Sequence, residues 1–118
     1  MSIYFLTNDL MFSSRVKGLA AENADRVQVC ATIDKVADQI DENEKSLVIL
    51  DLSTPGLNPS ESLPKLRERG KDRLTILAFA PHVHESKLES ARTASCDLVL
   101  TKGQFNSQIG EIIASHFE

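Results

Sequence analysis

Short apolar runs alternate along the chain with segments in which apolar residues recur every three or four positions. The clearest run, Leu47–Leu50, is unbroken, includes two β-branched residues and is followed by turn formers. Such a run is typical of a strand covered on both faces, as in a parallel sheet. Short apolar runs or weak alternation predict four further strands, at Ile3–Leu6, Arg26–Ala31, Leu74–Ala80 and Leu98–Leu100.

The segments between these strands predict helices, because their apolar residues fall on one face at a period of about 3.6 residues. A weaker helix is expected over Glu85–Ala94, with Leu88, Ala91 and Ala94 as its buried side. The expected buried faces of the other three periodic helices are Phe12, Val16, Leu19 and Ala20; Ile33, Val36, Ala37 and Ile40; and Ile109, Ile112, Ile113 with His116 or Phe117.

A further helix is expected after the central strand. Its first residues are typical of a helix start, but a proline lies in its interior. Asn58 can cap its N-terminus and Pro59 suits its first position. Pro64 would remove a backbone hydrogen bond inside the helix. The helix therefore either begins later, capped by Ser62, or is kinked, and it ends near Gly70.

Strand and helix alternate five times without an internal repeat or linker. This order predicts an α/β fold with a doubly wound, five-stranded parallel sheet and helices on both faces. The length of 118 residues, 42% of them hydrophobic, fits a single domain over residues 1–118.

The composition argues against several classes of function and indicates none directly. A net charge of −4 argues against nucleic-acid binding, and no apolar run is long enough to cross a membrane. The N-terminus lacks a signal peptide, so we expect a cytoplasmic protein. Cys30 and Cys96 lack metal-ligand spacing and are expected to be reduced and structural. We expect His82 and His84 to be exposed loop residues, and we find no motif of an enzyme.

Polar residues follow the predicted strands at the edge where open α/β sheets bind ligands. Asn8 and Asp9 follow the first strand, Asp51 the third and Lys102 the fifth. Two neighbouring carboxylates repel each other unless a cation lies between them, and Mg²⁺ suits such oxygen ligands. The set predicts a phosphoryl-acceptor site with Asp51 as nucleophile and Lys102 as the partner of a phosphate oxygen or of Asp51 itself.

Each of these residues also has a simpler interpretation. Asp51 can hydrogen-bond the following turn, and Asp9 can cap the first helix. Lys102 can form a static ion pair with Asp51. The grouping at one sheet edge favours the functional interpretation, because the simpler ones do not require the three side chains to meet.

The chain resembles, over essentially its full length, the receiver domains of two-component response regulators. The resemblance rests on Asn8-Asp9, on Asp51 followed four residues later by Pro55, and on Lys102. It implies a flavodoxin-like sheet of order 2-1-3-4-5 and phosphotransfer from a histidine kinase to Asp51. It also implies Mg²⁺ held by Asp9, Asp51 and the backbone carbonyl of Ser53, with Asn8 acting through a water molecule. In this order Cys30 and Cys96 lie at opposite sheet edges, which excludes a disulfide between them.

Two positions of the receiver switch depart from the family pattern. Ala80 replaces the Ser or Thr whose hydroxyl binds the phosphoryl group, and Val99 replaces the aromatic residue of the same switch. Asn8 also removes one charge from the acidic pair. We therefore carry two hypotheses: a stand-alone receiver phosphorylated on Asp51, and a pseudo-receiver that binds partners independently of phosphorylation. A flavodoxin-like domain that binds a small ligand such as flavin is a third.

The resemblance also implies partners. These are a histidine kinase or another signalling protein, and the docking face is the fourth helix, fifth strand and fifth helix. Homodimerisation through that face is included in the same expectation. In this chain the face surrounds Lys87, Arg92, Val99 and Gln108.

Overall fold

The structure, a computed structural model, describes residues 2–21 and 26–116, without the side chain of His116. The expected contribution of His116 or Phe117 to the last helix therefore lies outside the described residues. Among the described residues, no helix is long and apolar enough to cross a membrane.

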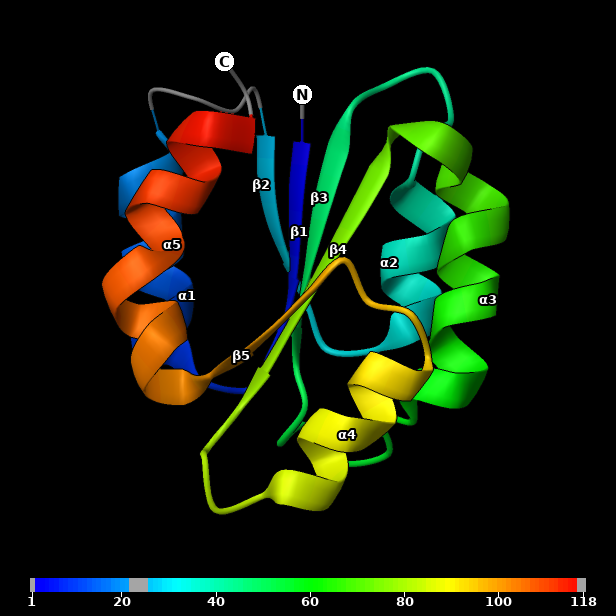
Figure 1. The fold of residues 1–118 in the computed structure, drawn as a ribbon. Coiled ribbons are helices and arrows are strands. Elements are labelled where there is room, and N and C mark those ends of the chain that lie inside the picture. Colours follow the sequence, from blue (N-terminus) through cyan, green and yellow to red (C-terminus); the bar gives the residue numbers. More distant parts are fainter. Residues whose placement is uncertain (1, 22–25, 117–118) are drawn as a thin grey trace.

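Five parallel strands form one sheet in the order β2-β1-β3-β4-β5, as expected (Figure 1). Helices α1 and α5 cover one face of this sheet, and α2, α3 and α4 cover the other. The strands are β1 (Ser2–Leu6), β2 (Arg26–Cys30), β3 (Ser46–Asp51), β4 (Leu74–Ala80) and β5 (Leu98–Thr101). The helices are α1 (Leu10–Ala20), α2 (Ile33–Gln39), α3 (Pro59–Gly70), α4 (Glu85–Thr93) and α5 (Lys102–His116), with a short 3₁₀ turn at Lys71–Arg73.

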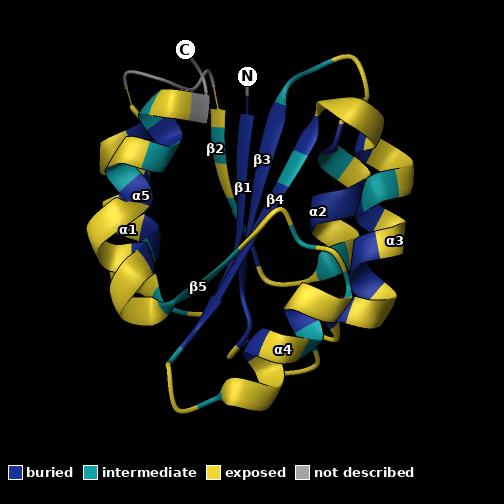
Figure 2. Ribbon diagram, viewed as in Figure 1, coloured by how far each residue is buried: buried dark blue, intermediate teal, exposed yellow. Residues whose placement is uncertain are grey.

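The three central strands are buried almost along their whole length, whereas the edge strands β2 and β5 are partly exposed (Figure 2). The face under α1 and α5 contains an aromatic cluster in which the rings of Phe79 and Phe105 stack with centroids 4.1 Å apart. The opposite face is mostly aliphatic, with Tyr4 as its buried aromatic residue, and packs against α2, α3 and α4. Two separate core layers therefore fix the central strands, whose carboxyl ends form one rigid edge.

The predicted elements agree with the structure except at some boundaries and positions. Asp51 is the last residue of β3 rather than the residue after it, and Ile40 follows α2 although it is buried. Leu19 was expected on the buried face of the first helix but is 36% exposed, because it lies at the rim of α1.

Helix α3 begins at Pro59, and Asn58 caps it by accepting a hydrogen bond from the Ser60 amide at 3.1 Å. The alternative start at Ser62 is wrong, since the helix continues through Pro64. The helix ends at Gly70, where a Cβ atom would lie 2.6 Å from the Leu74 Cβ. This close approach explains the glycine.

Both cysteines are free thiols in the structure. Burial raises the pKa of the Cys96 thiol to about 11 and also raises the pKa of Cys30. Protonated, buried thiols are unreactive. This agrees with the expected structural role.

The first half of β4 extends beyond β5, and side chains cover its open edge. Asp97 Oδ2 accepts a hydrogen bond from the Ile76 amide at 2.7 Å, while Arg67 donates to the Leu74 carbonyl at 3.1 Å. Arg67 also pairs with Asp97 at 2.9 Å. Unpaired strand edges invite association with other chains, so this arrangement protects the sheet.

Replacing Arg67 with alanine should therefore lower the free energy of unfolding by about 1–2 kcal/mol, because the Leu74 and Ser95 carbonyls lose the Arg67 donor and Asp97 keeps only the Ile76 amide. Arg69→Ala, on the same helix, removes one long hydrogen bond to the Asp38 carbonyl and should change stability by less than about 0.5 kcal/mol. Urea unfolding of both variants measures the difference. Equal effects of the two substitutions would contradict this role of Arg67.

Candidate functional site

Strand register brings the candidate residues together. Leu6 of β1 pairs with Leu50 of β3, so the next residues, Thr7 and Asp51, lie next to each other where these neighbouring strands end. Ala80 of β4 pairs with Thr101 of β5, which places Lys102 at the same edge. Residues that are far apart in the sequence thus meet in one cleft at the carboxyl ends of the parallel strands.

Asp51 is buried, with 9% of its surface exposed. Its Oδ2 accepts a hydrogen bond from the Thr7 hydroxyl at 2.7 Å, and its Oδ1 accepts one from the Ser53 amide at 3.0 Å. The bond to Ser53 confirms that Asp51 stabilises the following turn, which was the simpler interpretation. Each oxygen has a second lone pair that these contacts do not use.

Asp9 caps α1. Its Oδ1 accepts hydrogen bonds from the amides of Met11 at 3.0 Å and Phe12 at 3.1 Å. Its Oδ2 faces Lys102, whose Nζ lies 4.0 Å away. Because the cap uses one oxygen, the other remains directed into the cleft.

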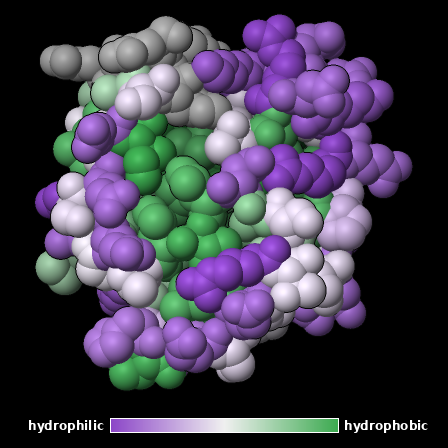
Figure 3. All heavy atoms as spheres, in the orientation of Figure 1, coloured by the Kyte–Doolittle hydropathy of each residue, from purple (hydrophilic) through white to green (hydrophobic). Residues whose placement is uncertain are grey.

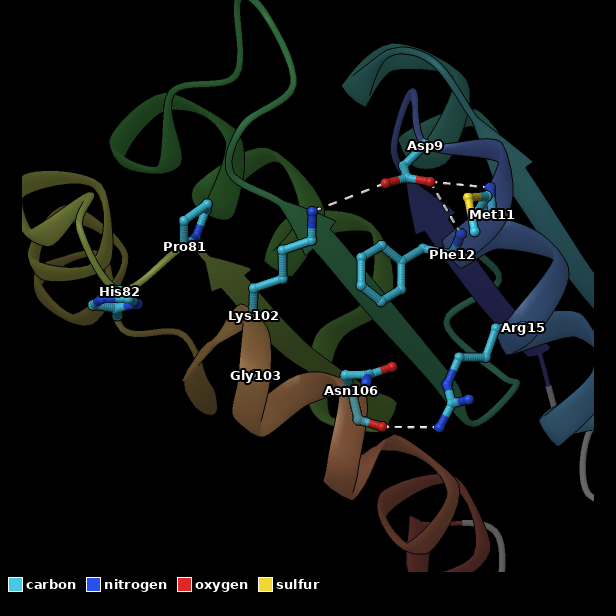
Figure 4. A pocket seen from close by; sticks show the side chains of 9 residues that line it. All are labelled: Asp9, Met11, Phe12, Arg15, Pro81, His82, Lys102, Gly103 and Asn106. Carbon is cyan, nitrogen blue, oxygen red and sulfur yellow. Dashed lines mark hydrogen bonds and ion pairs between the residues drawn. The ribbon is translucent and has the colours of Figure 1, made fainter.

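Lys102 is the first residue of α5 and is about half exposed. Its ammonium forms its ion pair with Asp9, not with Asp51, so the alternative of a static pair with Asp51 is wrong. The ammonium also lies 4.9 Å from the centroid of the Phe12 ring (Figure 4). The side chain of Lys102 lies between Pro81 and Asp9 (Figure 4), which places a positive charge at the mouth of the cleft.

Two adjoining clefts open at this edge. The first, which we call the acid cleft, has a volume of about 560 Å³ and contains both carboxylates. The second, larger and more apolar, has about 790 Å³ and shares Asp9, Met11 and Lys102 with the first (Figure 4). The acid cleft is lined by Asn8, Asp9, Leu10, Met11, Asp51, Ser53, Thr54 and Lys102.

The donor set of the acid cleft fits a magnesium ion. Within the described residues, no group of three or more His, Cys, Asp or Glu side chains is placed to hold a metal. Mg²⁺ needs only one or two carboxylates and completes its shell with carbonyl, amide and water oxygens. The buried hydroxyl of Thr54, which lines the same cleft, has no hydrogen-bond partner in the structure. The cleft therefore contains an oxygen atom, Thr54 Oγ1, that makes no hydrogen bond within the protein and is available as a ligand for a cation.

The two departures from the receiver pattern have structural consequences. Ala80 is fully buried at the end of β4 and presents a methyl group at the edge of the site. Val99 is half-buried in β5. At these two positions the side chains provide neither a hydroxyl donor nor an aromatic ring.

Within the described part of the chain, His82 and His84 do not belong to a group of three or more side chains placed to hold a metal. His82 is exposed and lines the apolar cleft, as expected for a loop residue. His84 differs from the expectation, because it is partly buried before α4 and its Nδ1 has no partner.

Sequence reasoning missed Thr7, which contacts both acidic residues. Its hydroxyl donates to Asp51, and its Oγ1 accepts a hydrogen bond from the Asp9 amide at 3.0 Å. The signal was present, since Thr7 directly follows the first apolar run. Phe12 was predicted as a core residue, and its contact with the Lys102 ammonium was also missed.

Comparison with known proteins supports the fold. No protein-family model matches the chain, and no curated protein matches its sequence. Solved structures match over almost the entire chain. A response-regulator receiver domain from Bermanella marisrubri has a TM-score of 0.76 at 19% identity, with 99% of this chain and 98% of that chain covered.

Two further structures carry information about ligands and assembly. The receiver domain of a sensor histidine kinase from Pseudomonas aeruginosa PAO1, with magnesium in its active-site cleft, has a TM-score of 0.74 at 15% identity, covering 98% of this chain and 96% of that one. The beryllofluoride-activated NtrC4 receiver domain, a dimer, has a TM-score of 0.72 at 13% identity and 98% coverage of both chains. The chain therefore has the fold of receiver domains.

Two substitutions at Asp9 separate its capping contacts from its charge. Asp9→Ala should lower the free energy of unfolding by about 1 kcal/mol, because two amides lose their acceptor. Asp9→Asn keeps an acceptor oxygen and should change stability by only a few tenths of a kcal/mol. Thermal or urea unfolding distinguishes the two, and a loss as large in Asp9→Asn as in Asp9→Ala would contradict the capping role.

Proposed function

We propose that this chain is a receiver domain that accepts a phosphoryl group on Asp51 and signals through protein contacts. The single observation that carries the proposal is the meeting of Asp9, Asp51 and Lys102 in one cleft at the carboxyl edge of a parallel sheet. An ordinary layered domain has no need for two carboxylates and an ammonium at that place. The fold shared with receiver domains is consistent with this role.

In the proposed reaction, a carboxylate oxygen of Asp51 attacks the phosphorus of a phosphohistidine or of a small acyl phosphate. The bond between phosphorus and the donor atom breaks, and its electron pair leaves with the imidazole or the carboxylate of the donor. Thr7 and Ser53 hold the Asp51 carboxylate in one orientation, so it does not have to be immobilised during the reaction. Lys102, at the cleft mouth, is placed to pair with a phosphoryl oxygen.

Magnesium is the proposed cofactor. Asp9 Oδ2, Asp51 and the Ser53 carbonyl would hold it, with Asn8 acting through water. When bound, Mg²⁺ neutralises charge that builds up on the phosphoryl oxygens. Asp9 would then exchange its 4.0 Å contact with Lys102 for the metal, which frees the ammonium for the phosphoryl group.

The proposed partners are a histidine kinase or another signalling protein, and a second copy of the chain. The docking face of α4, β5 and α5 carries Lys87, Arg92 and Gln108 as exposed residues. On the α5 side of that face lies a groove of about 430 Å³, and Figure 3 shows apolar side chains gathered in the hollow between α5 and β5. Leu98, 38% exposed, is at its rim.

Ala80 and Val99 limit how phosphorylation would change the structure in this proposal. Without a hydroxyl at the end of β4, a phosphoryl group cannot pull the β4–α4 loop inward by a side-chain hydrogen bond from that position. Phosphorylation would then change the charge of the acid cleft more than the shape of the distant face. The alternative, an interaction module independent of phosphorylation, becomes the conclusion if Asp51 accepts no phosphoryl group.

Incubation with acetyl phosphate and Mg²⁺ should add one phosphoryl group to the wild-type chain, because the Asp51 carboxyl group lines the cleft and is held in one orientation by Thr7 and Ser53. Intact-mass measurement detects the adduct. Asp51→Asn should abolish it, whereas Asp72→Asn, an exposed carboxylate on the 3₁₀ turn, should leave it unchanged. A wild-type chain without an adduct would reject the phosphoacceptor function.

For assembly, we expect concentration-dependent dimerisation in sedimentation velocity. Leu98→Lys should shift the chain to monomer, because the substitution replaces an exposed apolar side chain of the groove with a charged one. Leu19→Lys alters a side chain of similar exposure on α1 and should leave association intact. A wild-type chain that remains monomeric at every concentration, or equal effects of the two substitutions, would count against a dimer through this face.

A further inference from the structure

Thr7 does not line the acid cleft but makes the shorter of the two hydrogen bonds to the Asp51 carboxylate, although it was not among the predicted site residues. It directly follows β1 and is 5% exposed. Its Oγ1 lies 2.7 Å from Asp51 Oδ2 and 3.0 Å from the Asp9 amide nitrogen. An amide can only donate and a carboxylate can only accept, so the chemistry of the partners fixes the direction of both hydrogen bonds. The single hydroxyl proton of Thr7 is therefore committed to Asp51.

We propose that Thr7 is a positioning residue that shortens the lifetime of phosphorylated Asp51. This inference rests on the proposed phosphoacceptor function and adds a control on how long the signal persists. It requires no contact between Thr7 and the phosphoryl group, since Thr7 acts through the carboxyl group of Asp51.

The reason is the difference in charge between the two states of Asp51. As a free carboxylate, Asp51 carries a full negative charge shared by both oxygens. As an acyl phosphate, its carboxyl group is uncharged and is a weaker acceptor. A hydroxyl that donates to Oδ2 therefore stabilises the carboxylate more than the acyl phosphate, because hydrogen bonds to charged acceptors are the stronger ones.

This difference bears directly on hydrolysis. A water oxygen attacks phosphorus, the bond between phosphorus and the Asp51 oxygen breaks, and its electron pair remains on the carboxylate. The water proton leaves with inorganic phosphate or passes to solvent. Negative charge grows on the carboxyl group as the bond breaks, whichever oxygen carried the phosphoryl group. The Thr7 hydroxyl is already directed at that charge, so it lowers the barrier.

Burial makes the contact persistent. Thr7 and Asp51 are both buried, and the Asp9 amide holds the Thr7 oxygen in place from the other side. The other donor to Asp51, the Ser53 amide, belongs to the backbone and cannot be deleted by a side-chain substitution. Thr7 is therefore the donor whose contribution can be measured.

The test compares the lifetime of the phosphorylated protein in three variants. After acetyl phosphate is removed, Thr7→Val should lengthen the half-life of the adduct by about threefold to tenfold, since valine keeps the shape and lacks the hydroxyl. Thr7→Ser restores a donor and should return the half-life toward the wild-type value. Ser46→Ala, which removes a buried hydroxyl at the opposite end of β3 from Asp51, should leave it unchanged.

A second measurement uses the free protein and needs neither phosphate nor metal. If Thr7 and Asp51 interact, Thr7→Val should lower the folding equilibrium constant about fivefold or more in the wild type, and much less in an Asp51→Ala background. Equal losses in both backgrounds, or an unchanged adduct lifetime in Thr7→Val, would overturn the role of Thr7 while the phosphoacceptor function stands. A wild-type chain that forms no adduct rejects the function itself, and the role of Thr7 with it.

Discussion

The parallel register between β1 and β3 is the constraint on which the site depends. Leu6 pairs with Leu50, and this pairing sets Thr7 next to Asp51 at the point where both strands end. A shift of one residue would turn these side chains to the opposite faces of the sheet. The buried cores on both faces prevent such a shift, because every side chain of the central strands has a fixed place. The site residues at this edge are thus positioned by core packing that takes no part in the proposed reaction.

The site balances two kinds of contact. Asp51 is held by uncharged donors, a hydroxyl and an amide, whereas the nearest ammonium pairs with Asp9. The contact between Lys102 and Asp9 is long and half exposed, so it contributes little to stability and separates easily. The result is a firmly held carboxylate next to a weakly paired cation, an arrangement that suits the proposed transfer of a phosphoryl group to Asp51.

The alternation of apolar runs and helical periodicity was sufficient to predict the fold class and the grouping of Asp9, Asp51 and Lys102. It was not sufficient to predict contacts within the group. Whether Lys102 pairs with Asp9 or Asp51 depends on the course of α5 and on the Phe12 ring, which periodicity does not report. Thr7 was overlooked because a threonine after a strand is an ordinary turn former; only the register reveals that its hydroxyl reaches Asp51. Leu19 fits the helical period but lies at the rim of α1, because the period alone does not show how much of the helix its neighbours cover.

The central claim is that Asp9 and Asp51 form one cation-binding, phosphoryl-accepting cleft. The most direct measurement is a Mg²⁺ titration followed by amide NMR chemical shifts. The account predicts saturable changes concentrated at Asn8, Asp9, Asp51 and Ser53, and their loss in Asp51→Asn. Changes that never saturate, or that spread over exposed carboxylates elsewhere on the surface, would contradict it.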